Sequence, residues 1–265
     1  MKWKWLGLVV LLVALAMVGY WRREWDGRTR FSVVSVGREI EVLSFDPQTK
    51  LGVRMKLPEN LEVETVGGRG RIKSGNLVRA GQKFGGTRWV ADSVADYIGI
   101  AYTGEERHLG WWDRWLWWWM GREVNWSDIS TQVLGWMREM EAVDGEKFLV
   151  FSDAWAQERG KWFLDSAVAA EGMSVTMVNT TSTNGLGSHA AIAFETAGMR
   201  VREIRTEARV LEKCRVWGGK DTRKRAAAGW IIKNYSCQWG TDDKMSDEEM
   251  VVELGGDYRK WWLGE

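Results

Sequence analysis

Cysteine and histidine are scarce in this chain of 265 residues: each occurs only twice, and the net charge is only +1. Two cysteines are too few for a disulfide scaffold or a four-thiolate zinc site. His108 and His189 lie far apart without a neighbouring ligand pattern, so we expect no metal site. The near-zero charge gives no overall positive field, so we expect no nucleic-acid partner. The chain does have 45% apolar residues, enough to bury a core, and 20 tryptophans, a residue favoured in cores and at lipid–water interfaces.

An apolar run over residues 5–21 contains neither a charge nor a proline. At about 1.5 Å per residue it covers about 25 Å, near the lower limit for crossing a bilayer. Aromatic residues stand at both of its ends, as is typical of membrane–water interfaces. We therefore expect residues 1–30 to be a membrane anchor, with residues 5–21 in the lipid. The alternative is a cleaved signal peptide, because Ala14-Leu15-Ala16 has the small-x-small form of a cleavage site.

Short, valine-rich stretches after the anchor predict a strand-rich α/β region over 31–160. The glycine-rich segment 67–86 predicts a loop, and Thr87 can cap a helix that runs to about Tyr97. Cations in the loop could hold a phosphate together with backbone amides, the alternative being a solvated, mobile loop. These candidate anion-binding residues are Arg69, Arg71, Lys73 and Arg79. Strands are predicted over 31–37, 39–45, 51–57, 61–66 and 146–151, and further helices over 127–140 and 153–159.

Residues 111–120, WWDRWLWWWM, predict a helix that is apolar nearly all round. Trp111, Trp115, Trp118 and Trp119 form one stripe along it. Ten residues are too few to span a bilayer. We expect this helix to pack in the core; the alternative is a helix lying flat in the headgroup layer, where indole rings are stable.

The segment 165–260 alternates strands and helices in the order β-α-β-β-α-β, which predicts a second domain, a two-layer α/β sandwich. A polar turn follows its first strand and could offer amides and hydroxyls to a ligand, the alternative being a purely structural turn. The residues of this candidate ligand turn are Asn179, Thr180, Thr181, Asn184 and Gly185. Strands are predicted over 173–178, 199–204, 213–216 and 250–254, and helices over 187–197 and 221–233.

The sequence VTMVNTTSTNGLGSHAAIAFETAGMRV, residues 175–201, resembles the C-terminal domain of the LytR–CpsA–Psr cell-envelope proteins. The shared features are a strand, Asn-x-Thr, a Gly-Leu pair, an alanine-rich helix and a glycine before the next strand. The ending VVELGGDY, residues 251–258, is similar to the strand and Gly-x-Asp-Tyr that close that domain. The resemblance covers about 173–258.

A second segment, SFDPQTKLGVRMKLPENLEVE at 44–64, is similar to a strand–turn–strand of the catalytic domain of the same family. The family transfers a glycopolymer from a polyprenyl-pyrophosphate carrier to peptidoglycan, and its Arg and Asp side chains hold the pyrophosphate and a divalent cation. The resemblance places Glu59 and Asn60 at those two positions. A carboxylate there would repel the pyrophosphate. Region 31–160 therefore resembles a shortened, degenerate catalytic domain that has lost the chemistry.

We therefore expect a membrane-anchored, non-catalytic cell-envelope protein that binds a cell-wall component or a protein partner and needs no cofactor. The alternative is an active glycopolymer phosphotransferase that uses Mg²⁺. Its phosphate ligands would be Arg69, Arg71, Lys73 and Arg79, assisted by Arg88, with Asp92 or Asp96 for the cation.

The family resemblance implies that the soluble part lies outside the cytoplasmic membrane, although the Lys/Arg count around the anchor favours the cytoplasm. In an oxidising compartment a disulfide between Cys214 and Cys237 becomes feasible, because a strand and the end of the helix packed on it can meet. The alternative is two buried free thiols.

Overall fold

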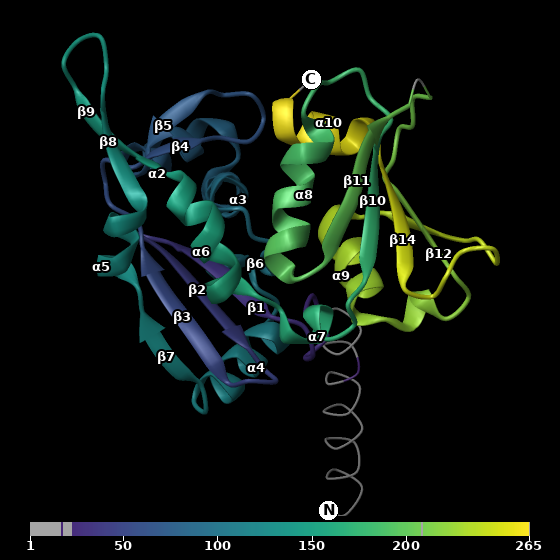
Figure 1. The fold of residues 1–265 in the computed structure, drawn as a ribbon. Helices are drawn as coiled ribbons and strands as arrows, with labels where there is room; N and C mark the ends of the chain where they lie inside the picture. Colours follow the sequence, from purple (N-terminus) through teal and green to yellow (C-terminus); the bar gives the residue numbers. More distant parts are fainter. Residues whose placement is uncertain (1–16, 18–22, 208, 265) are drawn as a thin grey trace, which may run out of the picture.

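The computed structural model describes residues 17, 23–207 and 209–264 and is a mixed α/β fold with two five-stranded sheets side by side (Figure 1). Within these residues no helix has both the length and the apolar character needed to cross a membrane. The anchor predicted over 5–21 lies outside the described residues apart from Met17, so it remains a prediction.

The first sheet has the order β6-β1-β2-β3-β7 and an antiparallel centre. Alternate side chains of a strand point to opposite faces, and in β1 both faces are buried. Phe31 and Val33 pack on one side, and Val34 and Val36 pack on the other. Burial on both sides explains the near-continuous apolar sequence of this strand. The strands are β1 (Phe31–Val36), β2 (Ile40–Asp46), β3 (Leu51–Lys56), β6 (Gly104–Glu105) and β7 (Asn125–Asp128).

One face of this sheet is covered by α3 (Gly86–Ile98). Val90, Val94 and Ile98 repeat every four residues on the helix and are all fully buried, as the sequence pattern predicts. The helix ends at Gly99, which has φ +83° and is therefore in the left-handed conformation that glycine adopts most easily.

The tryptophan-rich helix α4 (Trp111–Gly121) packs on the opposite face of the first sheet, but only along one side. Leu116, Trp117 and Met120 contact the small core around Phe45. The predicted stripe faces away from that core, with Trp111, Trp115, Trp118 and Trp119 exposed by 57%, 45%, 51% and 55%. The prediction that this helix packs in the core is therefore confirmed for its inner side and wrong for the stripe.

The glycine-rich segment 67–86 is not one long loop, as was predicted, because most of it forms β5 (Arg71–Lys73) and α2 (Ser74–Phe84). Glycine here serves close packing: a Cβ on Gly81 would lie 2.7 Å from the side chain of Val90 on α3. The composition that indicates a loop thus reflects two helices in near contact.

The helix predicted over 127–140 is wrong. The chain there forms the edge strand β7, one turn of α5 (Ser130–Val133), a 3₁₀ turn, and β8 (Met137–Glu141), which pairs with β9 (Lys147–Phe151). Ladder hydrogen bonds pair the backbones of β8 and β9 along their shared edge, and this tertiary pairing overrides the local helix signal. A second ribbon pairs β4 (Glu62–Glu64) with β5, and α6 (Asp153–Phe163) follows β9.

The second sheet has the order β11-β10-β14-β12-β13 and carries its own core. Figure 1 shows α8 and α9 on the side of this sheet that faces the first one. The predicted strands and helices are present, while α7, β13 and α10 were not expected. The elements are α7 (Ser166–Ala169), β10 (Ser174–Asn179), α8 (Leu186–Ala197), β11 (Arg200–Thr206), β12 (Arg215–Gly218), α9 (Ala226–Tyr235), β13 (Gln238–Thr241), β14 (Glu249–Leu254) and α10 (Gly256–Leu263).

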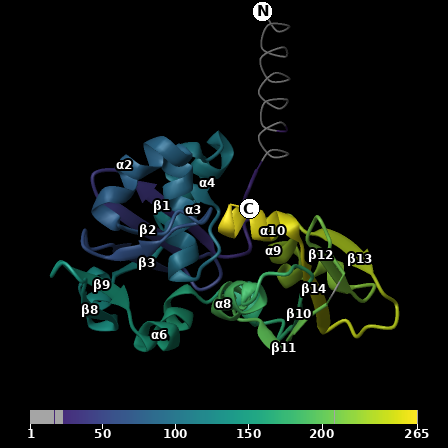
Figure 2. The ribbon, with the colours of Figure 1, turned by 90° about the horizontal axis from the view of Figure 1, so that it is seen from above.

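Buried carboxylates join the two halves of the described chain, the first built on the sheet of β1 to β3 and the second on the sheet of β10 to β14. Asp165 accepts a hydrogen bond from the backbone N–H of Arg30 at 2.8 Å, and Asp46 accepts one from that of Ser166 at 2.7 Å. Helix α6 of the first half also lies beside α8 of the second (Figure 2). These contacts hold the two halves together, and the candidate site lies in the seam between them.

Candidate binding cavity

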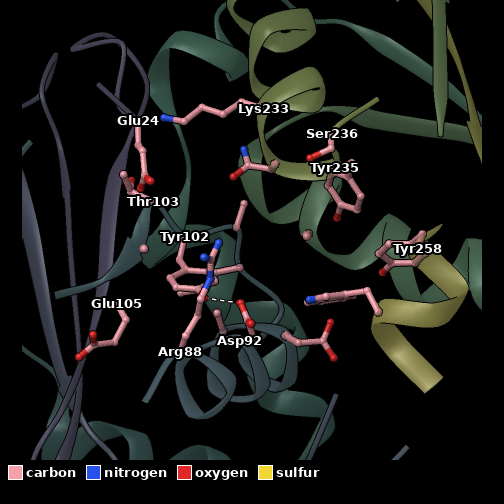
Figure 3. Close-up of a pocket in the computed structure, with 18 of the residues that line it drawn as sticks. Glu24, Arg88, Asp92, Tyr102, Thr103, Glu105, Lys233, Tyr235, Ser236 and Tyr258 are labelled. Atoms are coloured by element: carbon pink, nitrogen blue, oxygen red, sulfur yellow. Dashed lines mark hydrogen bonds between the residues drawn. The ribbon is translucent and has the colours of Figure 1, made fainter. Parts of the chain in front are cut away.

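A cavity of about 740 Å³ lies in the seam between the two halves. Its walls come from α3, the segment leading into β6, α8, the end of α9, α10, and residues 23–24. Figure 3 shows side chains from both halves around it. Elements distant in the sequence therefore build this site together.

Helix α3 presents Arg88, Asp92 and Asp96 to the cavity at spacings of four residues, which places them on one helix face. The Asp92 carboxylate accepts a hydrogen bond from the Tyr102 hydroxyl (Figure 3). Burial raises the pKa of Asp92 above its usual range, while this hydrogen bond and nearby Arg88 partly oppose the rise. Burial, together with Asp92, also raises the pKa of Tyr102, so its phenol stays protonated as a donor.

The cavity is bridged by Asp96 of the first half and His189 of the second. The His189 Nε2 and Asp96 Oδ1 atoms are 2.8 Å apart. The imidazole also stacks on Trp262, with ring centroids 4.2 Å apart. The hydrogen bond joins α3 to α8, and the stacking contact joins α8 to α10.

The wall from the second half is aromatic. The Tyr235 and Tyr258 rings lie 5.4 Å apart, and Tyr258 stacks on Trp261 at 5.5 Å. Burial raises the pKa of both tyrosines. Burial lowers the pKa of Lys233, which also lines the cavity, although acidic neighbours such as Asp26 oppose that shift. Flat rings with polar edges suit a ligand that is itself part apolar and part polar.

Carboxylates outnumber cations in the lining. Glu105 is buried, with Oε2 2.6 Å from His108 Nδ1, and its Oε1 atom has no hydrogen-bond partner. The excess of negative groups disfavours a diphosphate and favours a neutral or amine-bearing ligand. The acidic residues are Glu24, Asp92, Asp96, Glu105 and Asp257, and the basic residues other than histidine are Arg23, Arg88 and Lys233.

The carboxylates on α3 do not fit the Mg²⁺ of the alternative enzyme. Asp92 and Asp96 each use one oxygen on a protein partner, a phenol and an imidazole, which leaves one oxygen of each for a ligand. Mg²⁺ demands near-octahedral oxygen coordination. Across the described residues, no group of three or more His, Cys, Asp or Glu side chains could hold a metal. The described residues of the cavity therefore do not fit this ion.

The four candidate anion-binding residues lie on and around β5 and α2 rather than in the cavity wall. Three of them have acidic or amide partners, and the guanidinium of Arg69 lies over the ring of Phe84, 5.2 Å from its centroid. Such partners weaken the positive potential a phosphate would meet. Lys73 lies 2.6 Å from Glu146, Arg71 lies 4.0 Å from both Glu62 and Glu64, and Arg79 donates to Asn76 at 3.2 Å. Their anion-binding role stays a prediction.

The candidate ligand turn satisfies its own polar groups. Asn179 accepts hydrogen bonds from the N–H and hydroxyl of Thr181 at 2.9 and 2.8 Å, and the Thr180 hydroxyl donates to Leu254 O at 2.7 Å. These three residues are buried, whereas Asn184 and Gly185 are exposed. The geometry favours the structural alternative for the buried part of the turn.

Two further pairs of residues singled out in the sequence lie outside the cavity wall. Glu59 and Asn60 occupy an exposed turn before β4. Cys214 and Cys237 are joined in a disulfide, with their Cα atoms 4.4 Å apart, beside the cavity residue Asp257, which accepts hydrogen bonds from Cys214 N.

Sequence reasoning gave the α3 residues only as parts of the alternative enzyme and missed the aromatic wall. Tyr102, Lys233 and Tyr235 carry no local motif, because they meet only through folding. Tyr258 had a signal: it belongs to the Gly-x-Asp-Tyr ending, and the structure places that ending against the cavity.

No protein-family model matches the chain, and no curated protein matches it. Among solved structures it is similar to TagT bound to LIIa-WTA, at 12% identity and a TM-score of 0.25, over 73% of this chain and 84% of that chain. TagU of B. subtilis matches at 11% identity and a TM-score of 0.23, over 71% and 86%. A LytR-CPS2A-psr family protein, YwtF (TagT) with bound octaprenyl pyrophosphate lipid, matches at 11% identity and a TM-score of 0.25, over 73% and 82%. At such scores the likenesses carry no argument about this chain's fold or function.

Proposed function

We propose that this chain is a membrane-anchored, extracytoplasmic protein of the cell envelope that binds a polar cell-wall component in the seam cavity and does not transfer a glycopolymer. The observation that carries the proposal is the lining of the cavity, in which aromatic rings stand beside an excess of carboxylates. The location comes from the apolar run 5–21 and from the motifs that resemble LytR–CpsA–Psr proteins.

The chemistry of the lining narrows the ligand to an amine-bearing saccharide or peptide. Aromatic faces pack against the apolar face of a sugar ring, and carboxylates accept hydrogen bonds from hydroxyl and ammonium groups. A diphosphate would instead meet the carboxylates of Asp92 and Asp96, which disfavour it.

A calorimetric titration of the full chain in detergent with a disaccharide-peptide fragment of peptidoglycan tests the proposal. We expect binding, and we expect Asp92→Asn to weaken it about tenfold, the equivalent of one charge-assisted hydrogen bond. Asp144→Asn, on the exposed turn between β8 and β9, is the matched control and should change nothing. Absence of heat with the fragment, together with recovery of a crosslinked envelope protein, would replace this function with a scaffold role.

The second candidate is the glycopolymer phosphotransferase, favoured by one observation: Arg88 and Lys233 share the cavity with the α3 carboxylates. Incubation of the full chain with a polyprenyl-pyrophosphate analogue and Mg²⁺ discriminates between the two. Release of lipid pyrophosphate would establish the enzyme and overturn the binding function.

A further inference from the structure

The outer side of α4 is a tryptophan stripe on the surface of the described chain. Trp111, Trp115, Trp118 and Trp119 are spaced as one helix face, and each is about half exposed. Large apolar patches on a surface mark an interaction site, because water solvates indole rings poorly.

The surroundings of the stripe have the composition of a lipid-facing surface. The guanidinium of Arg122 lies 3.5 Å from the centroid of the Trp118 ring, and Arg114 is exposed on the same helix. Beside Trp115 and Trp119 runs a groove of about 360 Å³, lined also by Lys50 and Glu123, which pair with each other at 2.6 Å, so the cations that flank the stripe are Arg114 and Arg122. Indole rings flanked by cations are typical of helices that lie in the headgroup layer, where anionic lipids attract the cations.

The position of α4 relative to the predicted anchor selects the occupant. The buried carboxylate of Asp113 accepts hydrogen bonds from the backbone N–H groups of Glu24 at 2.8 Å and Trp25 at 3.1 Å. Glu24 is the third residue after the predicted span 5–21, and three extended residues cover at most about 10 Å. The first turn of α4 is therefore held within about the depth of a headgroup layer from the end of the span.

We propose that α4 lies in the lipid–water interface, with the tryptophan stripe inserted among phospholipid headgroups beside the anchor. This inference rests on the anchored state in the proposed function but not on the ligand of the cavity. Because Arg23 and Glu24 also line the cavity, a docked α4 holds the cavity at a set distance from the bilayer. The β8–β9 hairpin lies at the far end of the molecule from α4 (Figure 1).

Site-directed spin labelling of the full chain in vesicles of phosphatidylcholine and phosphatidylglycerol tests the proposal. A nitroxide on Trp118→Cys, and separately on Trp111→Cys, should lie about 5–10 Å below the phosphates, judged by collision with oxygen against a nickel chelate. The control label on Val143→Cys, at the fully exposed hairpin turn, should collide freely with the chelate. Cys214 and Cys237 are bonded to each other and do not take the label.

Equal chelate accessibility at 118, 111 and 143, in protein that resists alkaline extraction from the vesicles, would overturn the docking of α4 while leaving the anchor intact. Protein that alkali extracts from the vesicles would overturn both the anchor and this proposal. The calorimetric titration with the peptidoglycan fragment reports on the cavity independently of either result.

Discussion

Replacing Asp113 by asparagine should destabilise the protein substantially, although the side chain keeps its shape. The Asp113 carboxylate is fully buried and accepts two backbone hydrogen bonds, from Glu24 and Trp25. A hydrogen bond to a charged group contributes about 1.5–3 kcal/mol, and an amide can accept only one of the two while its NH₂ faces the other donor. The change should therefore cost about 2–4 kcal/mol.

At about 2–4 °C per kcal/mol for a chain of this size, that loss lowers the Tm by about 4–16 °C. The assay is thermal unfolding of the full chain in detergent, followed by near-UV circular dichroism, with hydrogen exchange at Glu24 and Trp25 as the local readout. Asp243→Asn, on an exposed loop, is the matched control. An Asp113→Asn variant with unchanged Tm and unchanged protection of both amides would refute the reasoning.

Three other predictions concern the fold around the seam. Reduction of the Cys214–Cys237 disulfide, which closes a loop with a sequence separation of 23, should cost about 3 kcal/mol, measured as a lower Tm in reductant; an unchanged Tm counts against it. Burial raises the pKa of Asp165 to about 6, above the unfolded value of about 3.9. Its contribution to the free energy of unfolding should therefore fall by about 2 kcal/mol as the pH rises from 4 to 6; an identical slope in Asp165→Asn contradicts this. Gly99→Ala, at φ +83° and with a Cβ 2.5 Å from an α8 side chain, should lose about 2–4 kcal/mol by urea unfolding, whereas Gly121→Ala has open space and should lose little.

The elements that the sequence predicted well are those whose local pattern and tertiary role agree. Strands β1 to β3 and helix α3 are buried by a regular set of side chains, so their periodicity appears directly in the sequence. The strand and helix that open the second half follow the same rule.

The elements that failed were decided by partners distant in the sequence. Helix α2 was taken for a loop because its glycines, such as Gly81, allow contact with Val90. The segment 127–140 was taken for a helix because its edge pairing with β3 and β9 has no local signature. Both errors come from reading composition without the neighbour that explains it.

The cavity could be predicted only in part for the same reason. Asp92 and Asp96 attract notice as carboxylates one helical turn apart, yet their partners Tyr102 and His189 come from a loop and from the other half. No spacing rule in a single sequence connects such residues before the fold brings them together.

The central claim, that the seam cavity binds a cell-wall fragment, is tested most directly by a crystal structure of the full chain grown with the peptidoglycan disaccharide-peptide. The account predicts electron density for the sugar against Tyr235 and Tyr258, with its amine near the α3 carboxylates. An empty cavity, with a prenyl diphosphate from a parallel soak held between Arg71 and Lys73, would contradict it.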